Sequence, residues 1–214
     1  MAHSTTRQAY NLVADKYHSL FGNELSEKEY DRMLLDFFAD RLEKGSLICD
    51  AGCGPSGHIG RYLTNKGMAI IGIDISDRCI ELASALNPDM HFVLGDIAKM
   101  SFDNESFDAV VSYYSIIHTP KNLVHIILRE YYRVLKPGGY LLIAIKAGSD
   151  ERLQTEFIGI ETEILLSLFD ENEIREYIIS NGFDIFFIEK REPYEFETNY
   201  ERIFVIGKKP ERSL

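Results

Sequence analysis

The sequence predicts a doubly wound α/β fold, in which two layers of helices cover a mostly parallel sheet. Three observations carry this prediction. Short apolar, β-branched runs alternate with helix-like segments between residues 46 and 146, which is the rhythm of βαβ units. Runs such as YLLIAI are apolar without alternation, as in parallel strands buried on both faces. The last two strand-like runs are too close together for a parallel crossover.

The first element is helical and covers residues 5–43. Apolar residues recur there at steps of three and four, which places them on one face of a helix. They are Tyr30, Met33, Leu34, Phe37, Phe38 and Leu42.

Strands and helices then alternate. The β-branched runs predict strands at 46–50, 69–73, 91–94, 107–112 and 139–146. The segments between them predict helices at 58–66, 76–86 and 120–134. Ser76 is a plausible N-cap for the second of these helices. The stretch RVLKPGG predicts a helix end, a Pro-Gly-Gly turn and the start of the next strand.

The last third of the chain breaks this rhythm. A helix at about 170–180 closes on Asn181-Gly182, a typical C-cap pair. FDIFFIEK and YERIFVIGKK follow, separated by about nine polar residues. A parallel crossover needs roughly a dozen residues or more, so these two strands are predicted to be antiparallel. With no repeat or linker, residues 1–214 are predicted to form one domain.

The net charge and the cysteine content limit the classes of binding partner and the cellular compartment that we expect. The net charge is −11 and no lysine- or arginine-rich run occurs, which argues against nucleic acid and against an anionic membrane surface. Three cysteines in no framework spacing indicate a reducing compartment. No signal peptide or membrane-span pattern is visible, so we expect a cytoplasmic protein.

The stretch DAGCGPSGH, residues 50–58, follows the first strand and opens a helix. Its glycines, Gly52, Gly54 and Gly57, have the GxGxxG spacing of a dinucleotide loop. Small residues let the backbone approach a ligand, and the helix N-terminus offers free N–H groups. A purely structural βα turn would show the same glycines, so the motif alone leaves both interpretations open.

Two more acidic residues end strands. Asp74 lies 22 residues after Gly52, where a carboxylate can accept both hydroxyls of an adenosine ribose; a helix N-cap is the alternative. Asp96, followed by Ile97, ends the third strand. This pair is placed to hold an adenine amino group and pack against the ring, although a surface loop residue is the simpler interpretation of Asp96.

Asp50 separates two classes of cofactor. A pyrophosphate in this loop would meet a like charge, and no Lys or Arg lies between residues 50 and 60 to offset it. At roughly 4–6 Å this repulsion costs about 1 kcal/mol or more at an effective dielectric constant near 20. A ligand with a cationic amine and a sulfonium is attracted instead. S-adenosyl-L-methionine has both, with ribose and adenine and no phosphate.

The motif set LICDAGCGPSG, IIGIDIS, VLGDI, FDAVVSYYSIIHTP and EYYRVLKPGGYLLIAI resembles the class I S-adenosylmethionine-dependent methyltransferases, small single-domain members in particular. The resemblance covers residues 10–208 and implies a Rossmann-like sheet of seven strands, order 3-2-1-4-5-7-6, with the last strand antiparallel. It also implies an N-terminal helical cap at 1–43, a cofactor-binding core at 44–146, and an acceptor-side insert with the last strands at 147–214.

The resemblance implies roles for single residues. Asp50, Gly52, Cys53 and Gly54 match the loop around the methionine moiety. Asp74 and Ile75 match the ribose and adenine position, and Asp96 and Ile97 match the adenine edge. Ser112 and Tyr113 match the end of strand 4, where the family's backbone faces the cofactor amino group. Tyr10 and Tyr17 resemble tyrosines that cover the cofactor; core packing is an alternative for both.

One departure from the family pattern concerns the loop. The family commonly has glycine where Ser56 stands here, and Gly57 follows one residue later. The loop is therefore predicted to be one residue longer, and Ser56, Gly57 and His58 are left outside the predicted site.

His118 is the candidate catalytic residue. Methyl transfer from a sulfonium needs mainly orientation, with a base where the acceptor must lose a proton. His118 follows strand 4 at the carboxyl-end rim and aligns with a histidine common in the family. Its alternative role is structural, as a loop residue before Pro120. No His, Cys or Asp spacing suggests a metal.

The sequence therefore predicts a methyltransferase that uses S-adenosyl-L-methionine, leaves S-adenosyl-L-homocysteine and acts on a small-molecule acceptor, as a monomer or homodimer. Two alternatives remain. An NAD(P)-dependent oxidoreductase is disfavoured by Asp50 and by the antiparallel tail, and Tyr10, Tyr17 and Tyr113 are not followed by a lysine at the Tyr-x-x-x-Lys spacing. A non-catalytic S-adenosylmethionine-binding protein would keep the same residues.

Overall fold

The computed structural model describes the backbone of residues 2–212 and the side chains of residues 5–212. Its main sheet has the strand order β3-β2-β1-β4-β5-β9-β8. Only β9 runs against its neighbours, because β5 and β8 both pair with it in the antiparallel sense. The predicted order, with an antiparallel last strand, is confirmed. The seven strands are β1 (Leu47–Ala51), β2 (Ala69–Asp74), β3 (His91–Leu94), β4 (Phe107–Tyr113), β5 (Leu135–Lys146), β8 (Asp184–Arg191) and β9 (Arg202–Lys208).

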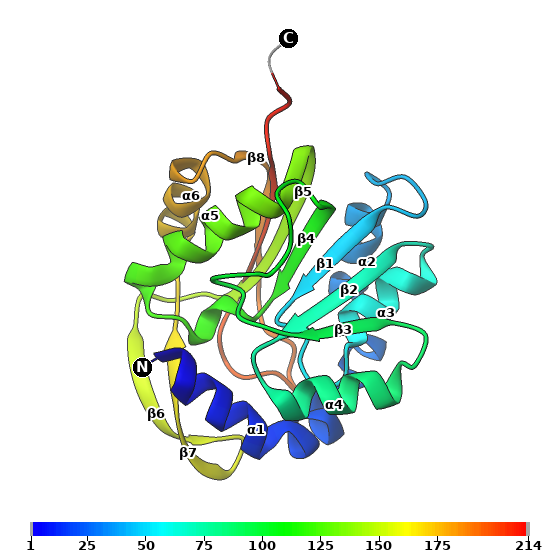
Figure 1. Cartoon of the computed structure of the whole chain (residues 1–214). Coiled ribbons are helices and arrows are strands. Elements are labelled where there is room, and N and C mark those ends of the chain that lie inside the picture. Colours follow the sequence, from blue (N-terminus) through cyan, green and yellow to red (C-terminus); the bar gives the residue numbers. More distant parts are fainter. Residues whose placement is uncertain (1, 213–214) are drawn as a thin grey trace.

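Helices cover both faces of this sheet (Figure 1). The helices are α1 (Ala2–Phe21), α2 (Glu29–Ala39), α3 (His58–Asn65), α4 (Asp77–Leu86), α5 (Val124–Val134) and α6 (Glu171–Ser180). On one face, α5 and α6 pack on a core that includes Phe107 and Tyr131. On the other, α2 and α3 pack on a core that includes Phe38 and Leu63. Both faces of β1, β4 and β5 are thus buried, which explains their unalternating apolar runs.

The helical region at 5–43 is interrupted. α1 ends at Phe21, a 3₁₀ turn covers Glu24–Ser26, and α2 begins at Glu29. Leu25 and Lys28 are buried at this break. The periodic stripe from Tyr30 onward belongs to α2 alone, and α1 lies elsewhere, across the end of the sheet between α4 and the hairpin described below (Figure 1).

The stretch RVLKPGG forms no separate turn. α5 ends at Val134 and β5 begins at Leu135, and the register of β5 against β4 shifts between Phe107 and Ala109. Gly138, with φ +78°, lies within this irregular start of the strand. The Pro-Gly-Gly signal therefore marks a bulge, which is another common use of glycine in a strand.

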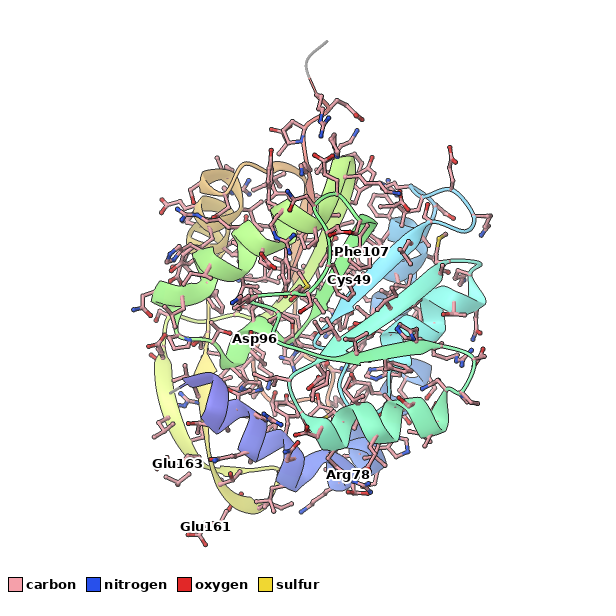
Figure 2. The ribbon with its side chains drawn as sticks, viewed as in Figure 1. Cys49, Arg78, Asp96, Phe107, Glu161 and Glu163 are labelled. Carbon is pink, nitrogen blue, oxygen red and sulfur yellow. The ribbon has the colours of Figure 1, made fainter. Side chains whose placement is uncertain are left out.

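Residues 147–169 hold a hairpin that the sequence analysis did not predict. Its strands are β6 (Glu151–Phe157) and β7 (Ile160–Ser167), joined by Ile158 and Gly159, whose φ values are +47° and +74°. Positive φ at both turn residues suits a two-residue hairpin. The hairpin lies beside α1 (Figure 1), and the side chains of Glu161 and Glu163 point away from the body of the protein (Figure 2).

Within residues 2–212, no helix combines the length and the apolar character needed to cross a lipid bilayer.

Candidate functional site

A cavity lies where the central strands end, beneath α1. Twelve of the thirteen residues that the sequence analysis proposed for the site line it, although they come from five separate stretches of the chain. They are Tyr10, Tyr17, Asp50, Gly52, Cys53, Gly54, Asp74, Ile75, Asp96, Ile97, Tyr113 and His118. In a doubly wound sheet the carboxyl ends of the strands form a crevice at this place, so the topology explains the convergence.

The glycine loop forms one wall. Gly52 has φ +81° and donates its N–H to the carbonyl of Ile73 at 2.8 Å. A Cβ on Gly52 would lie 2.3 Å from the Cβ of Ser115. Gly54 has φ +63°, and no atom would lie within 4 Å of a Cβ there. Glycine is therefore needed at Gly52 for close packing, and at Gly54 for its left-handed backbone.

The extra loop residue, Ser56, is held by hydrogen bonds outside the cavity. Its hydroxyl lies 2.9 Å from Nδ1 of His18 on α1, and its carbonyl accepts a hydrogen bond from the amide of Asn87. His58, which the sequence analysis left outside the site, lines the cavity, and its Nε2 lies 3.3 Å from Glu24. Ser56 thus ties the loop to α1.

Asp50 is almost fully buried at the end of β1. It is 1% exposed, and its Oδ2 accepts the N–H of Gly60 at 3.0 Å. Burial raises the pKa of Asp50 to about 6, although His58 and the Gly60 N–H act in the opposite sense. Asp50 is therefore mostly ionised at neutral pH and titrates in a range that is accessible to experiment.

Asp74 joins two loops. Its Oδ2 accepts the N–H of Gly54 and its Oδ1 accepts the N–H of Ser76, both at 2.9 Å. Ser76 caps α4 by accepting the N–H of Cys79, so the cap that the sequence analysis allowed for Asp74 is supplied by Ser76. Burial raises the pKa of Asp74. Each oxygen keeps a lone pair for a further donor from the cavity.

The carboxyl end of β3 contributes Asp96 (Figure 2). Its Oδ1 accepts the N–H of Ala98 at 2.8 Å, which orients the side chain beside Ile97. Asp96, Asp50, Asp74 and Glu24 together supply the four carboxylates of the lining, and the lining contains no Lys or Arg. The cavity is therefore suited to a cation and poorly suited to a phosphate.

Helix α1 closes the cavity. The rings of Tyr10 and Tyr17 lie 5.7 Å apart, and Tyr10 meets the ring of His118 edge-on at 5.6 Å. Ion pairs hold α1 against α4, Arg7 with Asp77 and Arg78 with Asp15, each at 2.7 Å. Both tyrosines line the cavity.

Ser112 is the one predicted site residue that does not line the cavity. It is fully buried, and its hydroxyl lies 2.6 Å from Ser115 Oγ and accepts a hydrogen bond from Tyr131. The side chain therefore points into the core. Tyr113, Tyr114 and Ser115 line the cavity at this strand end.

His118 is 7% exposed and lies in a 3₁₀ turn (Ile116–His118) that follows β4. Its Nδ1 lies 2.6 Å from the carbonyl oxygen of Leu165 on β7. A carbonyl only accepts, so Nδ1 carries the proton and Nε2 is the basic nitrogen. Burial lowers the pKa of His118 to about 4, and the imidazole is therefore neutral at physiological pH.

The remaining lining residues were not predicted. They are Thr6, Glu24, Pro55, His58, Ile59, Tyr114, Ser115, Thr119 and Pro120. Glu24 carries no sequence signal, because it reaches the site only through the break between α1 and α2. Among residues 5–212, no group of three His, Cys, Asp or Glu side chains is arranged to hold a metal ion.

Comparison with known proteins gives one family and several relatives. A family model described as "Methyltransferase domain" matches residues 49–143. Sterol 24-C-methyltransferase from Clavispora lusitaniae is 27% identical in an alignment of 206 positions that covers 85% of this chain and 54% of that protein. The Debaryomyces hansenii enzyme is 30% identical, over 84% of this chain and 54% of its own. The chain thus spans about half the length of these curated relatives.

Solved structures share the fold at low identity. Magnesium protoporphyrin IX methyltransferase from Synechocystis, with bound S-adenosylmethionine, has a TM-score of 0.74 at 18% identity, covering 98% of this chain and 97% of its own. The [4+2]-cyclase SpnF has a TM-score of 0.75 at 18% identity, covering 97% of this chain and 96% of its own. Because a cyclase shares the fold with methyltransferases, the reaction must be argued from the site.

Proposed function

We propose that the chain is a member of the class I S-adenosylmethionine-dependent methyltransferase family and that it transfers a methyl group from S-adenosyl-L-methionine to a small-molecule acceptor. One observation carries the proposal: four carboxylates and no Lys or Arg line the cavity at the strand ends. S-adenosylmethionine brings a sulfonium and an ammonium there and no phosphate. The same lining opposes the pyrophosphate of NAD(P).

The chemistry of the lining fits this cofactor part by part. Asp74, with Ile75 beside it, would hold the ribose hydroxyls, and Asp96 with Ile97 would hold the adenine. The backbone at Gly52 to Gly54 would approach the methionine part near Asp50. When bound, the cofactor supplies an activated methyl group on a positively charged sulfur. The protein's share is orientation, which contributes about 7–11 kcal/mol in favourable cases, and exclusion of water by Tyr10 and Tyr17.

We assign to His118 the removal of a proton from acceptors that carry one. Nε2 is the basic nitrogen because Leu165 holds the proton on Nδ1. With a pKa of about 4, the imidazole is neutral from about pH 5 upward, so it is ready to accept a proton but accepts it weakly.

The experiment that tests the proposed function is a thermal-shift comparison of S-adenosylmethionine, S-adenosylhomocysteine and NAD. We expect the first two to raise Tm and NAD to leave it unchanged. A rise with NAD alone would overturn the proposal. Formation of S-adenosylhomocysteine in a fractionated metabolite extract then separates an enzyme from a binding protein, and from a cyclase that does not consume the cofactor.

Removal of Nε2 tests the role of His118. In His118→Asn the amide nitrogen takes the place of Nδ1 and keeps the bond to Leu165, while the basic nitrogen is lost. We expect S-adenosylhomocysteine formation, in the extract fraction that the wild type turns over, to fall about 10²–10⁴-fold. The affinity of the variant for S-adenosylhomocysteine should equal that of the wild type. Full turnover by this variant would leave His118 with a structural role only.

The pKa of Asp50 predicts how cofactor affinity depends on pH. Only the ionised carboxylate attracts a cation, and its pKa is about 6. S-adenosylmethionine affinity should therefore be constant above about pH 7 and fall below pH 6, by up to about tenfold per pH unit. Calorimetry measures this directly. Asp50→Asn keeps an acceptor for the Gly60 N–H, so its affinity should be low and independent of pH; an unchanged slope would place the titration on another group.

A further inference from the structure

A second cleft adjoins the cofactor cavity and shares Tyr10, Tyr17, Glu24, Tyr114 and His118 with it. Its free volume is about 740 Å³, within the range of roughly 300–1,000 Å³ that ligand pockets occupy. Much of its wall is apolar, contributed by α1, by the turn after β4, by the hairpin and by the loop before β9. These side chains are Leu20, Phe21, Ile117, Phe157, Leu166 and Phe196. The cleft is thus placed to hold the acceptor beside the cofactor.

Three cations also line this cleft, and two of them are paired. Lys28 contacts Glu24 at 2.7 Å and Glu197 at 2.8 Å. Arg202 lies 3.7 Å from Glu197 and donates to the carbonyl of Thr198. Glu197 is itself paired with Arg191, so the buried carboxylates facing the cleft are already engaged. The remaining carboxylates of the lining, Glu27 and Glu156, are exposed at the surface.

Lys146 is the third cation, at the end of β5. Within residues 5–212 no carboxylate lies within ion-pair distance of its ammonium, and the centroid of the Tyr200 ring lies 5.6 Å from it. Burial, and next the charges of Arg202 and Lys28, lower its pKa to about 8, while Glu197 and Glu24 act in the opposite sense. Lys146 is thus partly buried, and the nearby cations Arg202 and Lys28 disfavour its charged form.

Tyr114 lines the same cleft and carries an unsatisfied hydroxyl. It has φ +57°, which is uncommon for a tyrosine, and its N–H bonds the carbonyl of Ala144. Lys28 and Arg202 lie 5.7 and 5.8 Å from its ring. Its hydroxyl is buried and has no hydrogen-bond partner in the described part of the chain. A buried hydroxyl without a partner is costly, and a strained backbone often marks a functional site.

We propose that the methyl acceptor is an amphipathic carboxylic acid, whose carboxylate is bound by Lys146 and the Tyr114 hydroxyl while its apolar body packs on the aromatic wall. This rests on the proposed function, because it names the acceptor class of the same site. An anion would pair the unpartnered ammonium and give the Tyr114 hydroxyl an acceptor. The apolar wall favours an aliphatic or aromatic body over a sugar or a nucleotide.

The test compares carboxylates with neutral isosteres. Hexanoate, decanoate and 3-phenylpropanoate are titrated by calorimetry into the protein saturated with S-adenosylhomocysteine, next to hexanamide, decanamide and 3-phenylpropanamide. We expect at least one acid to bind about tenfold or more tightly than its amide. Lys146→Met should remove that preference, Lys146→Arg should keep it, and Tyr114→Phe should weaken the acid about threefold. Lys136→Met, at a surface lysine paired with Asp108, is the matched control.

The pH dependence gives a second readout on the wild type. Acid binding should be constant up to about pH 8 and weaken above it as Lys146 loses its proton, while amide binding stays level. Equal affinity for acids and amides throughout the panel, or a preference that survives in Lys146→Met, would overturn the proposal. If the acids are preferred in a protein that does not bind S-adenosylhomocysteine, the proposed function fails and the anion site stands. If turnover falls in Lys146→Met without any change in the acid preference, Lys146 acts as a base instead.

Discussion

Asp74→Ala is expected to lower the affinity for S-adenosylmethionine about 10²–10⁴-fold, which would abolish the thermal shift. Its carboxylate is the proposed acceptor for both ribose hydroxyls, and hydrogen bonds to a charged group contribute about 1.5–3 kcal/mol each. The same carboxylate accepts the N–H groups of Gly54 and Ser76. The substitution therefore removes a ligand contact and also loosens the link between the two loops that frame the cavity.

A matched variant separates these two losses. Ser76→Ala removes the N-cap of α4, which accepts the N–H of Cys79, and should cost about 1 kcal/mol of folding stability. It leaves the carboxylate of Asp74 in place. We expect this variant to have a lower Tm without ligand and nearly full affinity in calorimetry. An undiminished S-adenosylmethionine thermal shift in Asp74→Ala would contradict the ribose assignment. An equal loss of affinity in Ser76→Ala would instead attribute the weaker binding to disorder of the loops.

The sheet was accessible to sequence reasoning because its signals are local. Each central strand contains an apolar run, and in the first two of them an acidic residue, Asp50 or Asp74, marks the end of that run. The short connection before β9 excluded a parallel crossover. Parallel topology then brings the strand ends together whatever the side chains are, so the residues proposed at these ends converge on one cavity.

The elements that were missed depend on contacts between distant segments. The β6–β7 hairpin turns at Ile158-Gly159, which lacks the Asn-Gly pair typical of such turns. Its register places the Leu165 carbonyl at His118, and that contact alone fixes the tautomer. Glu24 and Lys28 resemble surface residues in the sequence, yet they join Glu197 from the far end of the chain in a buried ion network. No spacing rule connects residues 170 positions apart.

Substitution by alanine at three glycines with similar backbone angles is expected to have the second large effect, on stability and on ligand affinity. Gly45, Gly52 and Gly54 have φ values of +84°, +81° and +63°, so alanine is strained by about 1–2 kcal/mol at each. Their surroundings differ. A Cβ at Gly45 or Gly54 meets no atom within 4 Å, whereas at Gly52 it would overlap Ser115 at 2.3 Å. Gly45 lies in the turn before β1, outside the cavity lining, while Gly54 lines the cavity.

We expect Gly45→Ala to lower the free energy of unfolding by the strain alone and to leave S-adenosylhomocysteine affinity intact. Gly54→Ala should lower the free energy of unfolding by the same amount. It should also reduce the affinity for S-adenosylhomocysteine by about tenfold or more, because the added methyl group would lie where the ligand approaches the backbone. Gly52→Ala should cost about 2–5 kcal/mol, since the overlap with Ser115 adds to the strain. Urea unfolding and calorimetry measure the two quantities separately. Should Gly54→Ala bind as Gly45→Ala does, the loop would not approach the ligand, and its glycines would serve the turn alone.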